Sequence, residues 1–128
     1  INRSTFEQEY SLETGSALLK IKTQANWLER HLLLKAAFHF NLKADRVSYE
    51  IPCGVMQHPT QPQTAAEKAR WEIPALQWAD LSDEWRGVSL LNDCKHGYSY
   101  QPDQLHLTLL RGAEWPDPEA DLGQHRFT

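Results

Sequence analysis

The sequence has few cysteines and no long apolar segment. Its two cysteines, Cys53 and Cys94, lack the close pairing of a CxxC motif, and two cysteines are too few for a disulfide framework. We therefore expect free thiols and a reducing, cytoplasmic location, with a single disulfide as the alternative. Apolar runs such as residues 32–34 are far shorter than the roughly 20 residues that span a bilayer, so the sequence predicts no transmembrane helix.

Positive charge is also scarce. The chain has 13 Lys and Arg residues against 17 Asp and Glu residues, which gives a net charge of -4, and no segment concentrates the basic residues. Binding to a phosphate backbone or an anionic membrane depends on clustered Lys and Arg. The composition therefore argues against nucleic acids and membranes as partners.

The remaining composition is typical of a folded protein, with 41% hydrophobic and 23% charged residues. A chain of 128 residues is long enough for one buried core, so we predict a single domain over residues 1–128. The chain starts with Ile1, Met56 is its only methionine, and residues 2–9 already resemble the interior of a strand. We therefore expect a piece of a longer protein.

Alternation of apolar and polar residues dominates the first half of the chain, which is typical of strands with one buried face. A first run over residues 5–13 and a second over residues 19–27 flank a turn at Thr14 and Gly15, and together they predict a hairpin. Two further runs, residues 32–42 and 46–51, bring the number of predicted strands before residue 52 to four.

Prolines mark the next segment. Four of them fall between Pro52 and Pro74, so we expect strand pairing to lapse there, with a short helix over residues 65–71 as one option. Strands return at residues 87–91 and 105–110, with turns at Gly97 and at residues 102–103 between them, and a last strand is expected at residues 124–128.

This pattern of short strands and Gly or Pro turns predicts an all-β fold, a two-sheet antiparallel β-sandwich. Side chains on the alternating apolar faces should point into the sandwich. The predicted inward residues are Phe6, Tyr10, Ile21, Leu34, Phe38, Tyr49, Leu107 and Leu109.

Two groups of residues raise the question of a metal site. The six histidines show no HxH or HExxH spacing, and the tightest cluster is Asp93, Cys94 and His96. Three potential ligands so close together seldom point at one ion, so we interpret this cluster as a polar turn next to a strand end.

The second group consists of alternating acids that could face a hard cation such as calcium. These acids are Asp117, Glu119 and Asp121. Their loop lacks the glycine and the terminal glutamate of the EF-hand pattern, so a solvated acidic loop is the preferred interpretation. The sequence thus predicts no metal site within this chain.

Five tryptophans are many for this length, and exposed aromatic rings are one means of stacking against sugars. Trp27 lies on the apolar face of its strand and is predicted to be in the core. For Trp71, Trp78, Trp85 and Trp115, which lie in irregular segments, burial against a sheet is expected more often than a role as a sugar platform. No GxSxG motif, active Cys/His pair or phosphate loop is present, so we predict no catalytic residue in the chain.

Several longer motifs follow one another in a specific order. They are NWLERHLLLK at residues 26–35, EIPCGV at 50–55, WADLS at 78–82, GVSLLNDCKHGY at 87–98 and PDPEADLG at 116–123. Together they resemble the C-terminal, all-β half of family 38 α-mannosidases over nearly the whole chain. Two positions depart from that pattern, since His96 and Cys53 stand where the family commonly has larger aromatic residues.

The resemblance implies a supersandwich-like fragment of a larger multidomain enzyme. That enzyme would be a retaining α-mannosidase whose zinc ion and catalytic residues lie in an N-terminal domain outside this chain. The partners implied are this catalytic domain and the α-mannoside substrate. Two hypotheses from other classes stay open: a freestanding carbohydrate-binding β-sandwich module and a structural sandwich for protein association.

One residue is assigned to substrate binding by the resemblance. The arginine that ends the family's apolar strand reaches the sugar-binding rim, and Arg111 is its match here. A guanidinium fork suits sugar hydroxyls and also the carboxylates of a neighbouring domain. An ion pair at a domain interface is therefore the alternative role of Arg111.

Overall fold

The computed structural model describes residues 3–128, and these residues form β-strands and one short helix. The strands are β1 (Thr5–Leu12), β2 (Leu19–Trp27), β3 (Leu34–His39), β4 (Arg46–Ile51), β5 (Gly54–Pro59), β6 (Ile73–Pro74), β7 (Trp78–Ser82), β8 (Gly87–Leu91), β9 (Gly97–Gln101), β10 (Gln104–Leu110) and β11 (Gly123–Phe127). The helix is α1 (Ala65–Lys68). The predicted all-β class is confirmed, and Asn2, placed by the sequence in the first strand, lies outside the described residues.

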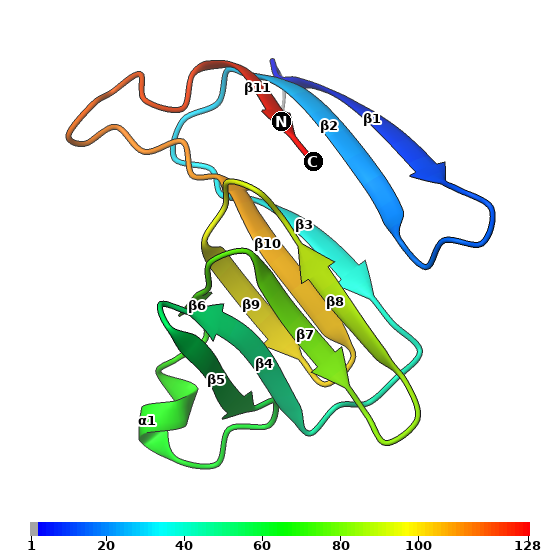
Figure 1. Ribbon diagram of the computed structural model, residues 1–128. Coiled ribbons are helices and arrows are strands. Elements are labelled where there is room, and N and C mark those ends of the chain that lie inside the picture. Colours follow the sequence, from blue (N-terminus) through cyan, green and yellow to red (C-terminus); the bar gives the residue numbers. More distant parts are fainter. Residues whose placement is uncertain (1–2) are drawn as a thin grey trace. The chain divides into compact units, whose positions relative to one another are not determined.

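The chain divides into two compact units, which are described separately. Unit 1 comprises the described residues up to Leu33 together with Leu110–Thr128, and unit 2 comprises Leu34–Leu109. Over residues 34–109, unit 2 contains the predicted pair of sheets, with strand orders β3-β10-β9-β6 and β5-β4-β7-β8 (Figure 1). The described part of unit 1 adds a third sheet, with the order β1-β2-β11.

The core of unit 2 follows from strict alternation in its strands. Val47 and Tyr49 of β4 are buried, and the register places them opposite Leu81 and Ala79 of β7, which are buried as well. Leu105 and Leu107 of β10 belong to the other sheet, and Tyr98 of β9 pairs with Leu107 and has no exposed surface. Each large apolar side chain buried in this way stabilises the fold by about 1.5–3 kcal/mol.

Strand β5 corrects the expectation that pairing lapses after Pro52. It pairs with β4 throughout, from Ile51 opposite Gly54 to Arg46 opposite Pro59. Pro52 occupies the two-residue turn together with Cys53, whose φ of 63° lies in the left-handed region, and Pro59 closes the strand. The prolines therefore bound this strand, in positions where no ladder donor is needed.

The helix is shorter than the predicted option of residues 65–71. It begins after Thr64, whose hydroxyl accepts a hydrogen bond from the Glu67 backbone N–H at 3.2 Å, while the Glu67 carboxylate accepts one from the Thr64 N–H at 3.0 Å. This reciprocal capping box fixes the start of the helix, but the helix ends after a single turn. So short a helix is marginal by itself, because helix nucleation is costly. No helix in residues 3–128 has the length and apolar character needed to cross a membrane.

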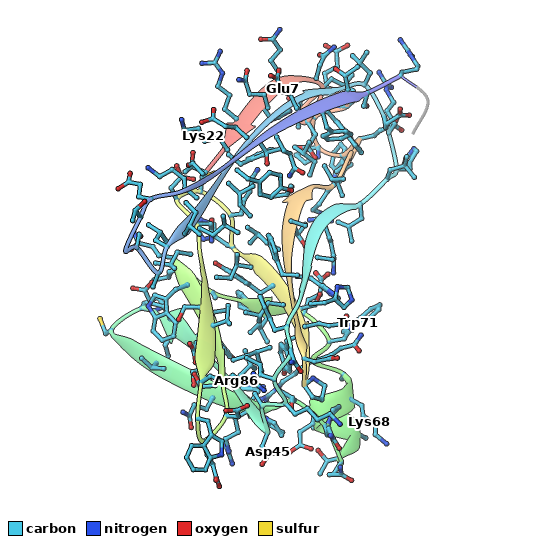
Figure 2. The ribbon with its side chains drawn as sticks, turned by 90° about the vertical axis from the view of Figure 1, so that its right-hand side faces the viewer. Glu7, Lys22, Asp45, Lys68, Trp71 and Arg86 are labelled. Carbon is cyan, nitrogen blue, oxygen red and sulfur yellow. The ribbon has the colours of Figure 1, made fainter. Side chains whose placement is uncertain are left out.

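Unit 1 is built on the predicted β1–β2 hairpin, with β11 antiparallel to β2 on its other side. Trp27 is completely buried, as predicted, and its ring lies 6.1 Å from that of Phe6. Glu7 and Lys22 lie on the opposite, polar face of this sheet (Figure 2), where Lys22 forms an ion pair with Glu9 at 3.5 Å.

The predicted core is confirmed in unit 2 and only partly in unit 1. Tyr49, Leu107 and Leu109 are buried, and three more predicted residues, Ile21, Leu34 and Phe38, are partly buried. Phe6 and Tyr10 were predicted to point inward, but 40% and 60% of their surfaces are exposed. Alternation determines which side chains share a face of β1, but it does not determine whether another layer covers that face.

Candidate functional site

Arg111 lies where β10 ends and the chain reverses. Leu110 before it is buried, Arg111 is exposed, and Gly112 after it is buried again. Gly112 has a φ of 58°, and an added Cβ would lie 3.1–3.2 Å from backbone atoms of Glu29, His31 and Leu32. Only glycine fits this contact, so the sequence Arg111-Gly112 places the arginine at a sharp and closely packed turn.

Two hydrogen bonds from the backbone to one carboxylate hold this turn. The N–H groups of Arg111 and Gly112 both donate to Oδ2 of Asp121, at 3.0 Å and 2.8 Å, and the N–H of His31 donates to the Gly112 carbonyl at 2.7 Å. By contrast, the Arg111 guanidinium forms no ion pair or hydrogen bond with any residue among 3–128. Arg111 is exposed, and its five donors remain available on a fixed backbone.

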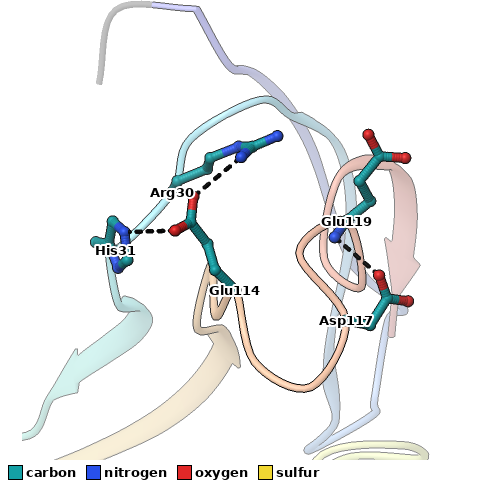
Figure 3. A network of polar contacts seen from close by, with 5 residues as sticks. All are labelled: Arg30, His31, Glu114, Asp117 and Glu119. Atoms are coloured by element: carbon teal, nitrogen blue, oxygen red, sulfur yellow. Dashed lines mark hydrogen bonds and ion pairs between the residues drawn. The ribbon is translucent and has the colours of Figure 1, made fainter.

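A second polar network lies in the same part of unit 1 (Figure 3). Glu114 accepts a hydrogen bond from Nη1 of Arg30 at 3.0 Å through Oε1 and contacts Nε2 of His31 at 2.9 Å through Oε2. The hydrogen bond from Arg30 lowers the pKa of the Glu114 carboxyl, and the charge of His31 acts in the same direction. Glu114 thus joins the loop that follows Arg111 to the segment between β2 and β3.

Sequence reasoning missed this network, although its signal was present. Arg30 and His31 belong to the ERH part of the first motif, but their partner Glu114 lies 84 residues from Arg30. His31 also has a φ of 55°, an uncommon conformation for a residue other than glycine. A partner so distant in sequence is visible only once the fold brings the two loops together.

The acidic loop after Glu114 uses its carboxylates on its own backbone. Oδ1 of Asp117 accepts a hydrogen bond from the Glu119 N–H at 2.9 Å (Figure 3), and Asp121 holds the turn at Arg111. Within residues 3–128, no three His, Cys, Asp or Glu side chains come together as a metal ion would require. These contacts favour the interpretation of the acids as loop-forming residues over a calcium site.

The other sequence cluster, at residues 93–96, forms the expected turn. Oδ1 of Asn92 accepts hydrogen bonds from the N–H groups of Cys94, at 3.1 Å, and Lys95. Nδ1 of His96 lies 3.2 Å from the Ala75 carbonyl oxygen, a contact with the backbone of a different segment. Partial desolvation of the Cys94 thiol raises its pKa, and the neighbouring Asp93 acts in the same direction. Both cysteines are free, and both residues are exposed.

Three of the tryptophans expected to be buried are instead exposed. The exposed fractions are 82% for Trp71, 89% for Trp85 and 87% for Trp115, whereas Trp78 is partly buried. The three exposed residues lie in segments between strands, and period-2 patterning says nothing about side chains outside strands. Their exposure keeps open a role in binding.

Comparison with known proteins agrees with the resemblance of the motifs. A family model described as "Glycosyl hydrolases family 38 C-terminal domain" matches residues 1–119. Alpha-mannosidase 2C1 of Homo sapiens is 40% identical over 125 residues, and alpha-mannosidase G of Dictyostelium discoideum is 42% identical over 114 residues. These matches cover 98% and 89% of this chain but only 12% and 10% of the two relatives.

Solved structures show the same fold. The crystal structure of an alpha-mannosidase from Enterococcus faecalis V583 matches with a TM-score of 0.74 at 19% sequence identity, covering 85% of this chain and 13% of that one. A second E. faecalis structure, of a protein in the glycosyl hydrolase family 38, matches with a TM-score of 0.68. From the family match and the sequence identity to these relatives, the chain belongs to the glycosyl hydrolase family 38 C-terminal domains.

Proposed function

We propose that this chain is a non-catalytic part of a retaining, zinc-dependent α-mannosidase, and that Arg111 contributes to the sugar-binding rim of that enzyme. The family of the chain and the names of its relatives support the parent activity. The geometry of Arg111 supports the second part, because its backbone is held by Asp121 while its guanidinium is exposed and unpaired among residues 3–128.

The assignment of zinc to the rest of the enzyme rests on the residues of this chain. Residues 3–128 contain no cluster of three potential ligands, and zinc in a catalytic site needs three protein ligands and an open position. We therefore assign the zinc ion and the attacking carboxylate to a catalytic domain N-terminal to this chain. Arg111 would add charged hydrogen bonds to the bound sugar from outside that domain.

The same proposal names the catalytic domain as the partner of an exposed apolar surface. This surface, the apolar hairpin face, consists of Phe6, Tyr10, Leu12 and Leu19 on β1 and β2. Leu12 and Leu19 are register partners and are 64% and 52% exposed. Clustered apolar side chains at a surface mark an interaction site, and the relatives contain a large part of their chain outside the matched region.

A cytoplasmic location is part of this proposal and is supported by the cysteines. Cys53 and Cys94 are both free and exposed, a state typical of reducing compartments.

The experiment uses the full-length parent protein and an aryl α-mannoside as substrate. We expect turnover that a chelator abolishes and added zinc restores, and we expect no turnover by the 128-residue chain alone. Turnover by the carefully purified chain, or undiminished activity of the parent after metal removal, would overturn the proposal.

A further inference from the structure

The outward face of the sheet β5-β4-β7-β8 carries a straight row of polar side chains. Val47, Tyr49, Ala79 and Leu81 of this sheet point inward, so the alternate residues point outward. Register partners align one outward residue from each strand, in the order Gln57, Ser48, Asp80 and Ser89. This polar row therefore crosses the whole sheet.

Hydrogen bonds fix the members of the polar row. Nε2 of Gln57 donates to Oγ of Ser48 at 3.1 Å, and Oγ of Ser89 donates to Oδ2 of Asp80 at 2.7 Å. Ser82, also on the outward face, donates to Oδ1 of Asp80 at 2.7 Å. The Asp80 carboxylate is thus held by one hydroxyl on each oxygen, and each oxygen keeps a lone pair to accept a further hydrogen bond.

Three members of the polar row, Gln57, Ser48 and Asp80, line an open depression with a volume of about 640 Å³. Arg46 and Trp85 also line it, beside Ser48, Gln57 and Asp80. Asp45 lines the depression too. In Figure 2 it lies at the same end of unit 2 as Arg86, the residue after Trp85.

The position of Trp85 is set by its turn. Oδ1 of Asp83 accepts hydrogen bonds from the N–H groups of Trp85 and Arg86, at 2.9 Å and 3.0 Å, and Oδ2 forms an ion pair with Nε of Arg86 at 3.7 Å. The backbone is therefore held while 89% of the Trp85 surface remains exposed. Any sheet face in contact with water is expected to be polar. Contact with water does not, however, require a carboxylate that accepts hydrogen bonds from two hydroxyls, or an exposed indole ring beside it.

We infer that this depression is a second carbohydrate-binding surface, which takes a neutral pyranose oligosaccharide. Sugar hydroxyls donate to Asp80 and accept from Arg46 and Gln57, and the C–H face of a pyranose ring stacks on Trp85. Hydroxyl groups both donate and accept, which matches a surface that offers both kinds of partner.

The charges argue against other ligand classes. Lys43 and Arg46 are outnumbered by Asp45, Asp80, Asp83 and Glu84 around the depression, so a phosphate or another polyanion is repelled. A protein partner that binds through apolar side chains would meet the polar row and leave its buried groups unpaired. The inference does not depend on Arg111 or on the parent's catalytic activity.

The test compares Trp85→Ala and Asp80→Asn with Trp71→Ala in the full-length protein. Trp71 is a matched control, because it belongs to the same unit, is 82% exposed and does not line the depression. Asp80→Asn keeps the shape of the side chain and so guards against a variant that fails only because it unfolds. Binding of mannotriose is measured by calorimetry after removal of metal with a chelator, and aryl α-mannoside turnover is measured separately with zinc.

We expect two binding sites for mannotriose, one of which loses roughly tenfold or more in affinity in Trp85→Ala and Asp80→Asn, a change of about 1.4 kcal/mol. Trp71→Ala should bind like the unmodified protein, and aryl α-mannoside turnover should be unchanged in all three variants. The inference is overturned if both variants bind mannotriose and matched gluco- and galacto-trisaccharides as the unmodified protein does. If the unmodified protein with zinc does not turn over the aryl α-mannoside, the proposed enzyme function fails. That outcome is measured separately from mannotriose binding, so the two failures can be told apart.

Discussion

Arg111 is the residue whose surroundings bear most directly on the proposed function. Its peptide N–H is fixed by Asp121, the next residue must be glycine, and its side chain is exposed. We predict that Arg111→Ala in the full-length enzyme lowers kcat/KM by roughly ten- to a hundredfold, as expected for a lost charged hydrogen bond of about 1.5–3 kcal/mol. Arg111→Lys should restore part of that loss, because it keeps the charge but not the fork.

Arg126 offers a control for this variant in the same unit. It is exposed on β11 and pairs with Gln24 on the polar face of the sheet, so Arg126→Ala should leave kcat/KM unchanged. Chemical denaturation should show changes of at most about 0.5 kcal/mol for either exposed arginine. A variant at Arg111 that keeps full activity but unfolds more easily would assign the residue a structural role and withdraw it from the sugar-binding rim.

At the scale of single elements, the sequence pattern predicted the hairpins and turns whose residues are close together in the chain. The β1–β2 hairpin follows from alternation on both sides of Gly15, which has a φ of 80°. The turn before β10 follows from Pro102 and Asp103. Strand β9 was missed because Gly97 was interpreted as a turn residue, whereas its place in the strand depends on pairing with Pro74 of β6.

The candidate site shows the same division between local and distant information. The sequence placed Arg111 at a strand end, and the structure agrees. The hydrogen bond that the Arg111 N–H donates to Asp121, ten residues away, and the one that Arg30 donates to Glu114, 84 residues away, depend on loops that meet only in the fold. Strand patterning carries no information about such contacts, and it could not predict the exposure of Phe6 and Tyr10 either.

The apolar hairpin face leads to a prediction about the β1–β2 element. The double variant Leu12→Ser, Leu19→Ser should lower the melting temperature of the full-length enzyme. If the catalytic domain covers both leucines, each substitution removes buried apolar surface, which lowers the free energy of unfolding by about 1 kcal/mol for a side chain that is half exposed in this chain. Calorimetry would measure the transition that contains this domain. Lys20→Ser, on the opposite face of β2, should have no such effect.

An unchanged melting temperature for the double leucine variant would show that the apolar hairpin face is exposed to solvent in the parent protein. The hairpin would then need another explanation for its exposed leucines, and the assignment of the catalytic domain as its partner would fail.

At the scale of the whole molecule, the family match discriminates between the hypotheses that the sequence left open. A freestanding sugar-binding module and a structural sandwich both fit an all-β fold with exposed tryptophans. The match over residues 1–119 places the chain among C-terminal domains of larger glycosyl hydrolases. The sugar-binding surface inferred at Trp85 would therefore be part of such a C-terminal domain and not of a freestanding module.

The last prediction concerns the pH dependence of stability, which the core of unit 2 determines. Tyr98 has no exposed surface, its hydroxyl accepts a hydrogen bond from Nδ2 of Asn92, and burial raises its pKa to about 12. Burial also raises the pKa values of Tyr49 and Tyr100. In the unfolded chain a tyrosine loses its proton near pH 10, whereas in the folded sandwich Tyr98 keeps it up to about pH 12.

The unfolded state therefore binds fewer protons than the folded state between pH 10 and about 12, so the free energy of unfolding falls as pH rises through this window. The contribution of Tyr98 is fully present below pH 10, and its loss amounts to about 2 kcal/mol by pH 12. Urea denaturation of the chain at a series of pH values from 9 upward would measure the slope. Tyr98→Phe should flatten it, whereas Tyr10→Phe, at an exposed position, should not. If the slope persists undiminished in Tyr98→Phe, the alkaline loss of stability arises from groups other than Tyr98, and Tyr49 and Tyr100, whose pKa values are also raised, would be the next to test.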